Sequence, residues 1–175
     1  MKLPFGKMSI QRFKINILGD SKVGKSSYVN WLLTNNFSST YVPTLGVDVH
    51  VLHFTSNYGN IIFDVWDCAG EFKASTNMTL NSNYAIIMCD ITNINSIENT
   101  NKWVEQFRNV IVCGNKIDKI DKHYNDEFDE LPFEKVLISV KTLNNLITPF
   151  EILARMLTGH NDLVLRRYIN KVKND

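Results

Sequence analysis

A glycine-rich segment near the start of the chain has the residue types that hold phosphate groups. It reads GDSKVGKSS and fits the pattern G-x-x-x-x-G-K-[ST], with an apolar run before it and a helical pattern after it. Glycines let the backbone wrap so that successive N–H groups point at the α- and β-phosphates of a nucleoside triphosphate. We expect Lys25 to reach the β- and γ-phosphates and the Ser26 hydroxyl to bind Mg²⁺. The residues of this phosphate loop are Gly19, Asp20, Ser21, Lys22, Val23, Gly24, Lys25, Ser26 and Ser27.

A second polar motif, NKID, follows an apolar run and has the residue types that select guanine. Its position after a strand matches the carboxyl end of a sheet, where open α/β folds bind ligands. The Asp118 carboxylate can accept two hydrogen bonds from guanine, whereas adenine offers no such donor pair. A polar mismatch of this kind is worth roughly 10⁴-fold in selectivity. We expect Asn115 to tie this loop to the phosphate loop, and the stem of Lys116 to cover one face of the base.

The elements that must position these motifs alternate between strands and helices. Such alternation predicts an α/β fold, with a mostly parallel sheet of six strands and helices on both faces. The pattern around Ser56–Asn60 predicts a hairpin turn between two antiparallel strands. We expect strands at Ile15–Leu18, Gly46–Phe54, Ile61–Trp66, Tyr84–Asp90, Val110–Gly114 and Lys135–Ser139, and helices at Lys25–Asn36, Ser96–Arg108 and Thr148–Gly159.

The bulk properties predict one soluble domain. The chain has 175 residues and a net charge of +1, which does not suggest a nucleic-acid partner. The three cysteines lie in or beside apolar runs and read as buried thiols of an intracellular protein that is not secreted. We expect a monomer without a membrane anchor. The expected divisions are an N-terminal extension (1–9), the domain itself (10–160) and a basic C-terminal tail (161–175).

A long run from Tyr41 to Gly70, YVPTLGVDVHVLHFTSNYGNIIFDVWDCAG, resembles the small GTPases of the Ras superfamily, and most closely their Ran branch. The resemblance continues through AIIMCDIT, VCGNKID, ISVKT and FEILARMLTG and covers roughly residues 10 to 163. It implies the P-loop NTPase fold of a small G domain. It also implies a molecular switch that binds GTP, GDP and Mg²⁺.

The resemblance assigns roles to further residues. Thr44 matches the threonine that binds Mg²⁺ and senses the γ-phosphate, and Asp67 matches the aspartate that holds Mg²⁺ through water. Gly70 matches the glycine whose N–H meets the γ-phosphate, and Phe37 the aromatic side chain that stacks edgewise on guanine. The family's Ser-Ala-Lys motif falls on Ser139, Val140 and Lys141, where the N–H of Val140 would contact the guanine carbonyl oxygen.

The expected catalytic residues are Lys25, Thr44, Gly70 and Glu71, and one of them departs from the pattern of the family. The family carries a glutamine directly after the Ala-Gly pair to orient the attacking water, but here the next residue is Glu71. Either Glu71 replaces the glutamine, or the glutamine is deleted and Glu71 is its former neighbour. Both alternatives remove the neutral amide, so we expect slow GTP hydrolysis. The competing hypothesis is a non-hydrolysing GTP-binding decoy or scaffold that titrates transport factors.

A second departure concerns partners. The Ran branch has a basic patch and an acidic tail, whereas here Asn125–Glu130 is acidic and the tail from Arg166 to Lys173 is basic. We hypothesise that the tail and the acidic segment meet in one nucleotide state; the alternative is that both are solvated charge clusters. The resemblance implies nuclear transport receptors, an exchange factor and an activating protein as partners, in the nucleus and the cytoplasm.

Overall fold

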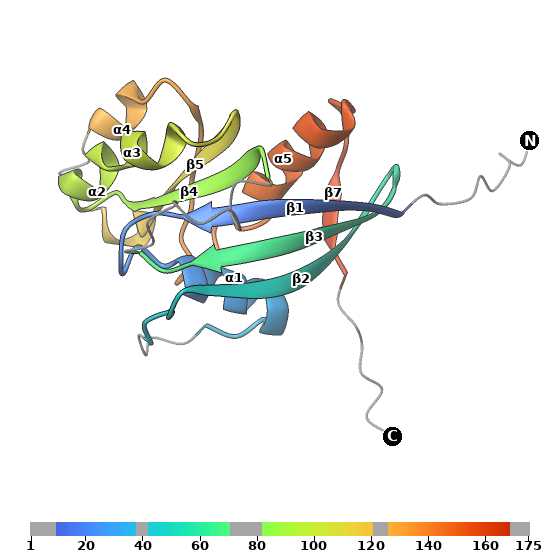
Figure 1. Ribbon diagram of the computed structural model, residues 1–175, viewed down its shortest axis with the longest axis horizontal. Helices are drawn as coiled ribbons and strands as arrows, with labels where there is room; N and C mark the ends of the chain where they lie inside the picture. Colours follow the sequence, from blue (N-terminus) through green and yellow to red (C-terminus); the bar gives the residue numbers. More distant parts are fainter. Residues whose placement is uncertain (1–9, 38–41, 71–81, 121–125, 169–175) are drawn as a thin grey trace, which may run out of the picture.

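The fold is built on one seven-stranded sheet with the strand order β6-β5-β4-β1-β3-β2-β7 (Figure 1). The computed structural model describes residues 10–37, 42–70, 82–120 and 126–168. The strands are β1 (Ile10–Leu18), β2 (Val47–Ser56), β3 (Gly59–Cys68), β4 (Tyr84–Asp90), β5 (Asn109–Asn115), β6 (Glu134–Leu137) and β7 (Leu165–Arg167). The helices are α1 (Lys25–Thr34), α2 (Ile94–Glu98), α3 (Thr100–Val104), α4 (Glu127–Glu130) and α5 (Thr148–Thr158), with a 3₁₀ turn, η1, at Ile117–Lys119.

Parallel pairing brings the predicted motifs to one end of the sheet. Strand β1 pairs in parallel with β3 and β4, and β4, β5 and β6 continue in parallel. The carboxyl ends of β1 and β3 therefore lie side by side, as their arrowheads show in Figure 1. Strands β2 and β3 form the predicted antiparallel hairpin, with Ser56 opposite Gly59. The predicted α/β class with a mostly parallel sheet is confirmed.

The number of strands was predicted wrongly, because β7 adds a seventh at the β2 edge. It pairs antiparallel with Phe54–Ser56. Its sequence holds two arginines in three residues, which gives no strand signal of its own. The segment is held there by Leu163 and Leu165, which are 0% and 5% exposed and belong to the main core. The region expected to be a tail from residue 161 thus contains a strand of the sheet.

The single helix expected over Ser96–Arg108 was also wrong. Two short helices, α2 and α3, replace it, and they are separated at Asn99. Asn and Thr favour the helix less than Ala or Leu do. The Thr100 hydroxyl donates to the carbonyl of Ile97 at 2.6 Å, so the side chain bonds locally to the backbone at the break.

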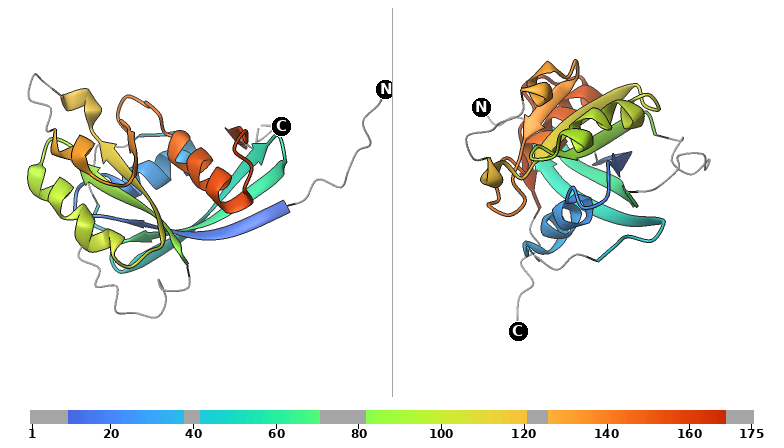
Figure 2. Two further views of the ribbon diagram at one scale, coloured as in Figure 1. Left: turned by 90° about the horizontal axis from the view of Figure 1, so that it is seen from above. Right: turned by 90° about the vertical axis from the view of Figure 1, so that its left-hand side faces the viewer.

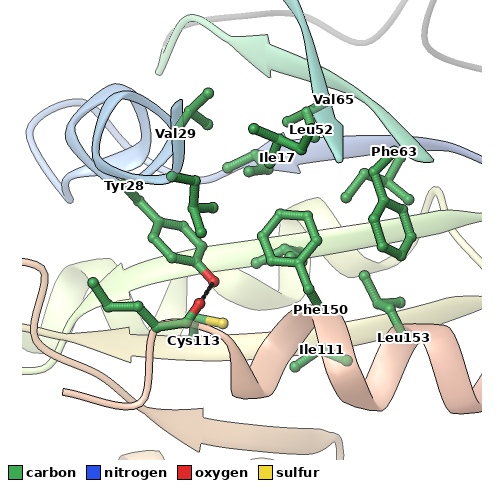
Figure 3. Close-up of a cluster of buried hydrophobic side chains, with 14 of the residues drawn as sticks. Ile17, Tyr28, Val29, Leu52, Phe63, Val65, Ile111, Cys113, Phe150 and Leu153 are labelled. Carbon is green, nitrogen blue, oxygen red and sulfur yellow. Dashed lines mark hydrogen bonds between the residues drawn. The ribbon is translucent and has the colours of Figure 1, made fainter. Parts of the chain in front are cut away.

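Two hydrophobic clusters fill the two sides of the sheet, since successive strand residues point to opposite faces. The larger cluster joins Tyr28 and Val29 of α1 to Phe150 and Leu153 of α5 (Figure 3). The second cluster contains Ile97 of α2 and Phe128 of α4, with Trp103 and other half-buried side chains against it. Figure 2 shows helices on both sides of the sheet, as the sequence predicts.

We expect Tyr28→Phe to lower the free energy of unfolding by about 1 kcal/mol. Tyr28 is fully buried, and its hydroxyl donates to the carbonyl of Leu146 at 2.6 Å. The change leaves that carbonyl without this donor and alters little of the packing. Urea unfolding followed by circular dichroism measures the effect. Tyr168→Phe, at a residue that is 55% exposed, is the matched control, and equal losses in both variants would contradict the prediction.

The acidic segment and the described part of the basic tail lie at opposite edges of the sheet. Helix α4 packs into the second cluster through Phe128, and Lys135 of β6 donates to the carbonyl of Leu131 just after it. Arg166 and Arg167 belong to β7, at the other end of the strand order. The described parts of the two segments are therefore apart; the remainder of the tail lies outside the described residues, so the hypothesis that the two meet in one nucleotide state stays a prediction.

Cys68, Cys89 and Cys113 are free and buried, as predicted. Within the described ranges, none of the helices is both long enough and apolar enough to span a membrane.

Candidate nucleotide-binding site

A cavity of about 1340 Å³ lies at the carboxyl ends of the parallel strands. It brings together most of the residues that the two motifs and the resemblance single out. Those that line it are Ser21, Lys22, Gly24, Lys25, Ser26, Ser27, Phe37, Thr44, Gly70, Asn115, Lys116, Asp118, Val140 and Lys141. Of the predicted site residues that the structure describes, those that are not in its lining are Gly19, Asp20, Val23, Asp67 and Ser139.

Some lining residues carry no signal that sequence reasoning used. Val42, Pro43 and Leu45 flank Thr44, and Leu45 is 90% exposed. Asn30 enters the lining from α1. Asn30 lies one helical turn after Ser26, and this spacing is the signal that could have found it.

The phosphate loop folds around the side chain of Lys25. This residue begins α1 and is 6% exposed, and its ammonium donates to the carbonyls of Gly19 and Asp20 at 2.8 and 2.9 Å. Burial lowers the pKa of Lys25, while the nearby carboxylates of Asp67 and Asp20 oppose that shift. The ammonium thus closes the loop and lies at the N-terminus of a helix, where anions bind favourably.

Gly19 is required by a close approach of two backbones. A Cβ atom there would lie 2.0 Å from the carbonyl oxygen of Met88, and its φ is +134°. We expect Gly19→Ala to cost on the order of 3 kcal/mol or more in unfolding free energy. Gly46→Ala is the matched control, because Gly46 has φ +76° with nothing within 4 Å of its Cβ position. Gly46→Ala should lose only about 1 kcal/mol of unfolding free energy, because the one penalty is that of an alanine in the left-handed backbone conformation. Thermal unfolding compares the two, and similar losses would contradict the steric explanation.

Oxygen ligands suited to Mg²⁺ meet beside the phosphate loop. The hydroxyls of Ser26 and Thr44 lie 2.7 Å apart, although the residues come from different segments. Asp67 is 1% exposed, and its Oδ1 has no hydrogen-bond partner among the described residues. Burial raises the pKa of Asp67, against the lowering effects of the Ser26 hydroxyl and Lys25. A buried carboxylate oxygen that accepts no hydrogen bond from the described part of the chain, next to two hydroxyls, is a suitable set of ligands for a hard divalent cation.

Gly70 packs directly against the phosphate loop. A Cβ atom at this position would lie 2.2 Å from the backbone nitrogen of Ser21, so only glycine fits without a shift. The preceding residue, Ala69, donates its N–H to the carbonyl of Gly46 at 2.9 Å. This contact ties the segment after β3 to the segment before β2. The next residue, Glu71, lies outside the described residues, so the expectation about its role stays a prediction.

Asn115 connects three segments at the other end of the cavity. It is 3% exposed, its amide donates to the carbonyl of Val23 at 2.8 Å, and its oxygen accepts from the N–H of Val140 at 3.1 Å. The predicted tie to the phosphate loop is thus present in the structure. Gly24 must lack a side chain here, because a Cβ would lie 2.4 Å from the Asn115 amide nitrogen.

Hydrogen bonds and an ion pair hold the side chains of Lys116 and Asp118 in position at the cavity. The Lys116 ammonium donates to the carbonyl of Lys22 at 2.9 Å and to Asp90 at 2.5 Å. The Asp118 carboxylate accepts from the Ser139 hydroxyl at 2.6 Å, and the Lys141 ammonium lies 3.9 Å from its other oxygen. Phe37 lines the same cavity and is 41% exposed. A carboxylate acceptor, a lysine stem and an aromatic ring therefore line the same cavity.

The chain belongs to the Ras family, whose family model matches residues 14–157. The matched region contains the phosphate loop, Asp67, Gly70, the NKID motif and Ser139–Lys141. Members of this family are GTPases that bind guanine nucleotides.

Among individual relatives, the chain is 35% identical over 175 residues to the GTP-binding nuclear protein GSP1 of Encephalitozoon cuniculi (strain GB-M1). The alignment covers 90% of this chain and 82% of that relative. The predicted resemblance to the Ran branch of the Ras superfamily is confirmed.

Proposed function

We propose that this protein is a guanine-nucleotide switch that binds GTP and GDP with Mg²⁺ and hydrolyses GTP slowly. The observation that carries the proposal is one cavity lined both by the phosphate loop and by Asp118. Either motif alone would leave the base or the phosphates unaccounted for. Membership of the Ras family supports the same conclusion.

In this proposal the chain's own residues bind and orient the nucleotide. The N–H groups of the phosphate loop and the Lys25 ammonium hold the phosphates, while Asp118 accepts from guanine and the stem of Lys116 covers it. Ser26, Thr44 and Asp67 would hold Mg²⁺, which supplies positive charge beside the β- and γ-phosphates. Thr44 and the N–H of Gly70 report the presence of the γ-phosphate, and loss of that phosphate releases both segments.

We expect slow hydrolysis because the residue directly after Gly70 is Glu71 and not a glutamine. The Glu71 carboxylate would meet the like charge of a triphosphate, which costs on the order of 1 to 4 kcal/mol at a few ångströms. No arginine precedes Thr44 within residues 38–43 of the sequence to compensate. Single-turnover phosphate release from GTP-loaded protein measures the rate. Glu71→Gln should accelerate it; a fast intrinsic rate in the parent would contradict the expectation.

The biological role that we propose is protein transport between nucleus and cytoplasm, on the strength of the relative named a GTP-binding nuclear protein. A pull-down from nuclear and cytosolic extracts, with the protein loaded with GTP or with GDP, tests this role. Transport receptors retained only in the GTP form support it. The alternative, a non-hydrolysing decoy that titrates transport factors, predicts the same binding with no phosphate release, with or without an activating protein.

A further inference from the structure

The side chain of Asp20 is held on the side of the phosphate loop that faces α2 and α3. Its Oδ2 accepts from the amide of Asn99 at 2.8 Å, and its Oδ1 accepts from the indole N–H of Trp103 at 3.2 Å. Both oxygens of the carboxylate are thus engaged by neutral donors. We call Asp20, Asn99 and Trp103 the Asp20 clamp.

The donors of the clamp are themselves fixed. Asn99 joins α2 to α3, and its oxygen accepts from the Lys102 ammonium at 2.5 Å, which orients the amide nitrogen toward Asp20. Trp103 packs against the second hydrophobic cluster, which includes Ile97. The two helices, which pack against β4, therefore present this pair of donors to the loop that follows β1.

The backbone of Asp20 touches the groups that would meet the phosphates. Its carbonyl accepts from the Lys25 ammonium at 2.9 Å. A Cβ added to Gly70 would lie 2.7 Å from the Asp20 carbonyl carbon, so the two segments are in close contact. Asp20 itself does not line the cavity, although its neighbour Ser21 does. The clamp thus keeps a carboxylate away from the site of a polyanion while it fixes the carbonyl beside Lys25.

We propose that the Asp20 clamp sets how tightly the phosphate loop holds its nucleotide, with Asn99 and Trp103 as positioning residues that act through Asp20. Loss of one donor leaves the Asp20 carboxylate held by a single hydrogen bond, so that the side chain can turn toward the cavity, where its charge repels the phosphates. A change in the packing of helices α2 and α3 would then alter the rate of nucleotide release through Asp20. This inference rests on the proposed function.

The test is the rate at which a fluorescent GDP analogue dissociates from the full chain in excess Mg²⁺ and unlabelled GDP. Trp103→Phe keeps an aromatic ring and removes the donor, and Asn99→Ala removes the other donor. Since hydrogen bonds to charged groups are strong, we expect each change to speed dissociation by about 5- to 50-fold. Trp31→Phe is the matched control, because the Trp31 indole N–H has no partner among the described residues.

Two readouts separate positioning from a general loss of structure. In an Asp20→Ala background, Trp103→Phe should add no further acceleration, since the shared acceptor is already gone. The indole N–H signal of Trp103 in a ¹⁵N-labelled sample should shift in Asp20→Ala, while that of Trp31 stays. The inference is overturned if both donor variants release the GDP analogue at the rate of the parent. It is also overturned if Trp103→Phe accelerates release as much in the Asp20→Ala background as in the parent. Failure of the parent to bind GDP is a separate result, which overturns the proposed function and the inference together.

Discussion

Asp118→Asn is expected to weaken GTP and GDP binding by about 10²- to 10⁴-fold without creating affinity for ATP. The amide keeps one acceptor oxygen and places an NH₂ donor where the second acceptor was, so at least one of the two hydrogen bonds from guanine is lost and a donor faces a donor. Asn can still accept from the Ser139 hydroxyl, which now contacts Asp118 at 2.6 Å, so the fold should persist. Isothermal titration with each nucleotide in Mg²⁺ measures the change.

The matched control for this charge is Asp126→Asn. Asp126 is exposed, precedes α4 and makes no side-chain capping bond there. The Asp126→Asn variant should bind GDP with the affinity of the parent. If Asp118→Asn bound GDP as tightly as Asp126→Asn, the carboxylate would not select the base, and the site of guanine recognition would have to lie elsewhere.

Lys25→Met is expected to lower GTP and GDP affinity by about 10³-fold, because it removes a cation whose charge-assisted hydrogen bonds would reach the phosphates. Burial already opposes the charge of Lys25, so an apolar side chain of similar length should be accommodated in the empty protein. The variant also loses the hydrogen bonds to the carbonyls of Gly19 and Asp20, so we expect its melting temperature without nucleotide to lie at or below that of the parent. The rise in melting temperature on adding GDP should disappear.

Arg166→Met is the control that removes a positive charge far from the cavity, at the β7 edge of the sheet. It should keep the full stabilisation by GDP. A Lys25→Met variant with undiminished stabilisation would contradict the phosphate-binding role, whatever its melting temperature without ligand.

Many of the residues that line the cavity could be singled out from the sequence, because the motifs that contain them are local. Loops of this type bind phosphate mainly through backbone N–H groups, so a short motif between a strand and a helix is sufficient to specify their geometry. The NKID motif was equally clear, and the expected tie between Asn115 and the phosphate loop appears as a hydrogen bond to Val23.

The rest could not be predicted because it depends on contacts between distant residues. Strand β7 forms because Leu163 and Leu165 find room in a core made by other segments, and its own residues give no strand pattern. In the Asp20 clamp, Asn99 and Trp103 lie 79 and 83 positions after Asp20 in the sequence. The residues near Asp20 give no signal that these two side chains are its donors. Glu71 lies outside the described residues, so its part in hydrolysis rests on the sequence alone.

The most direct test is a competition measurement on the full chain loaded with fluorescent GDP in Mg²⁺. Unlabelled GTP should displace the probe at near-stoichiometric concentration, and ATP should fail at concentrations about 10³-fold higher. Equal displacement by ATP, or no binding of the probe at all, would contradict the claim that Asp118 and the phosphate loop act together on one guanine nucleotide.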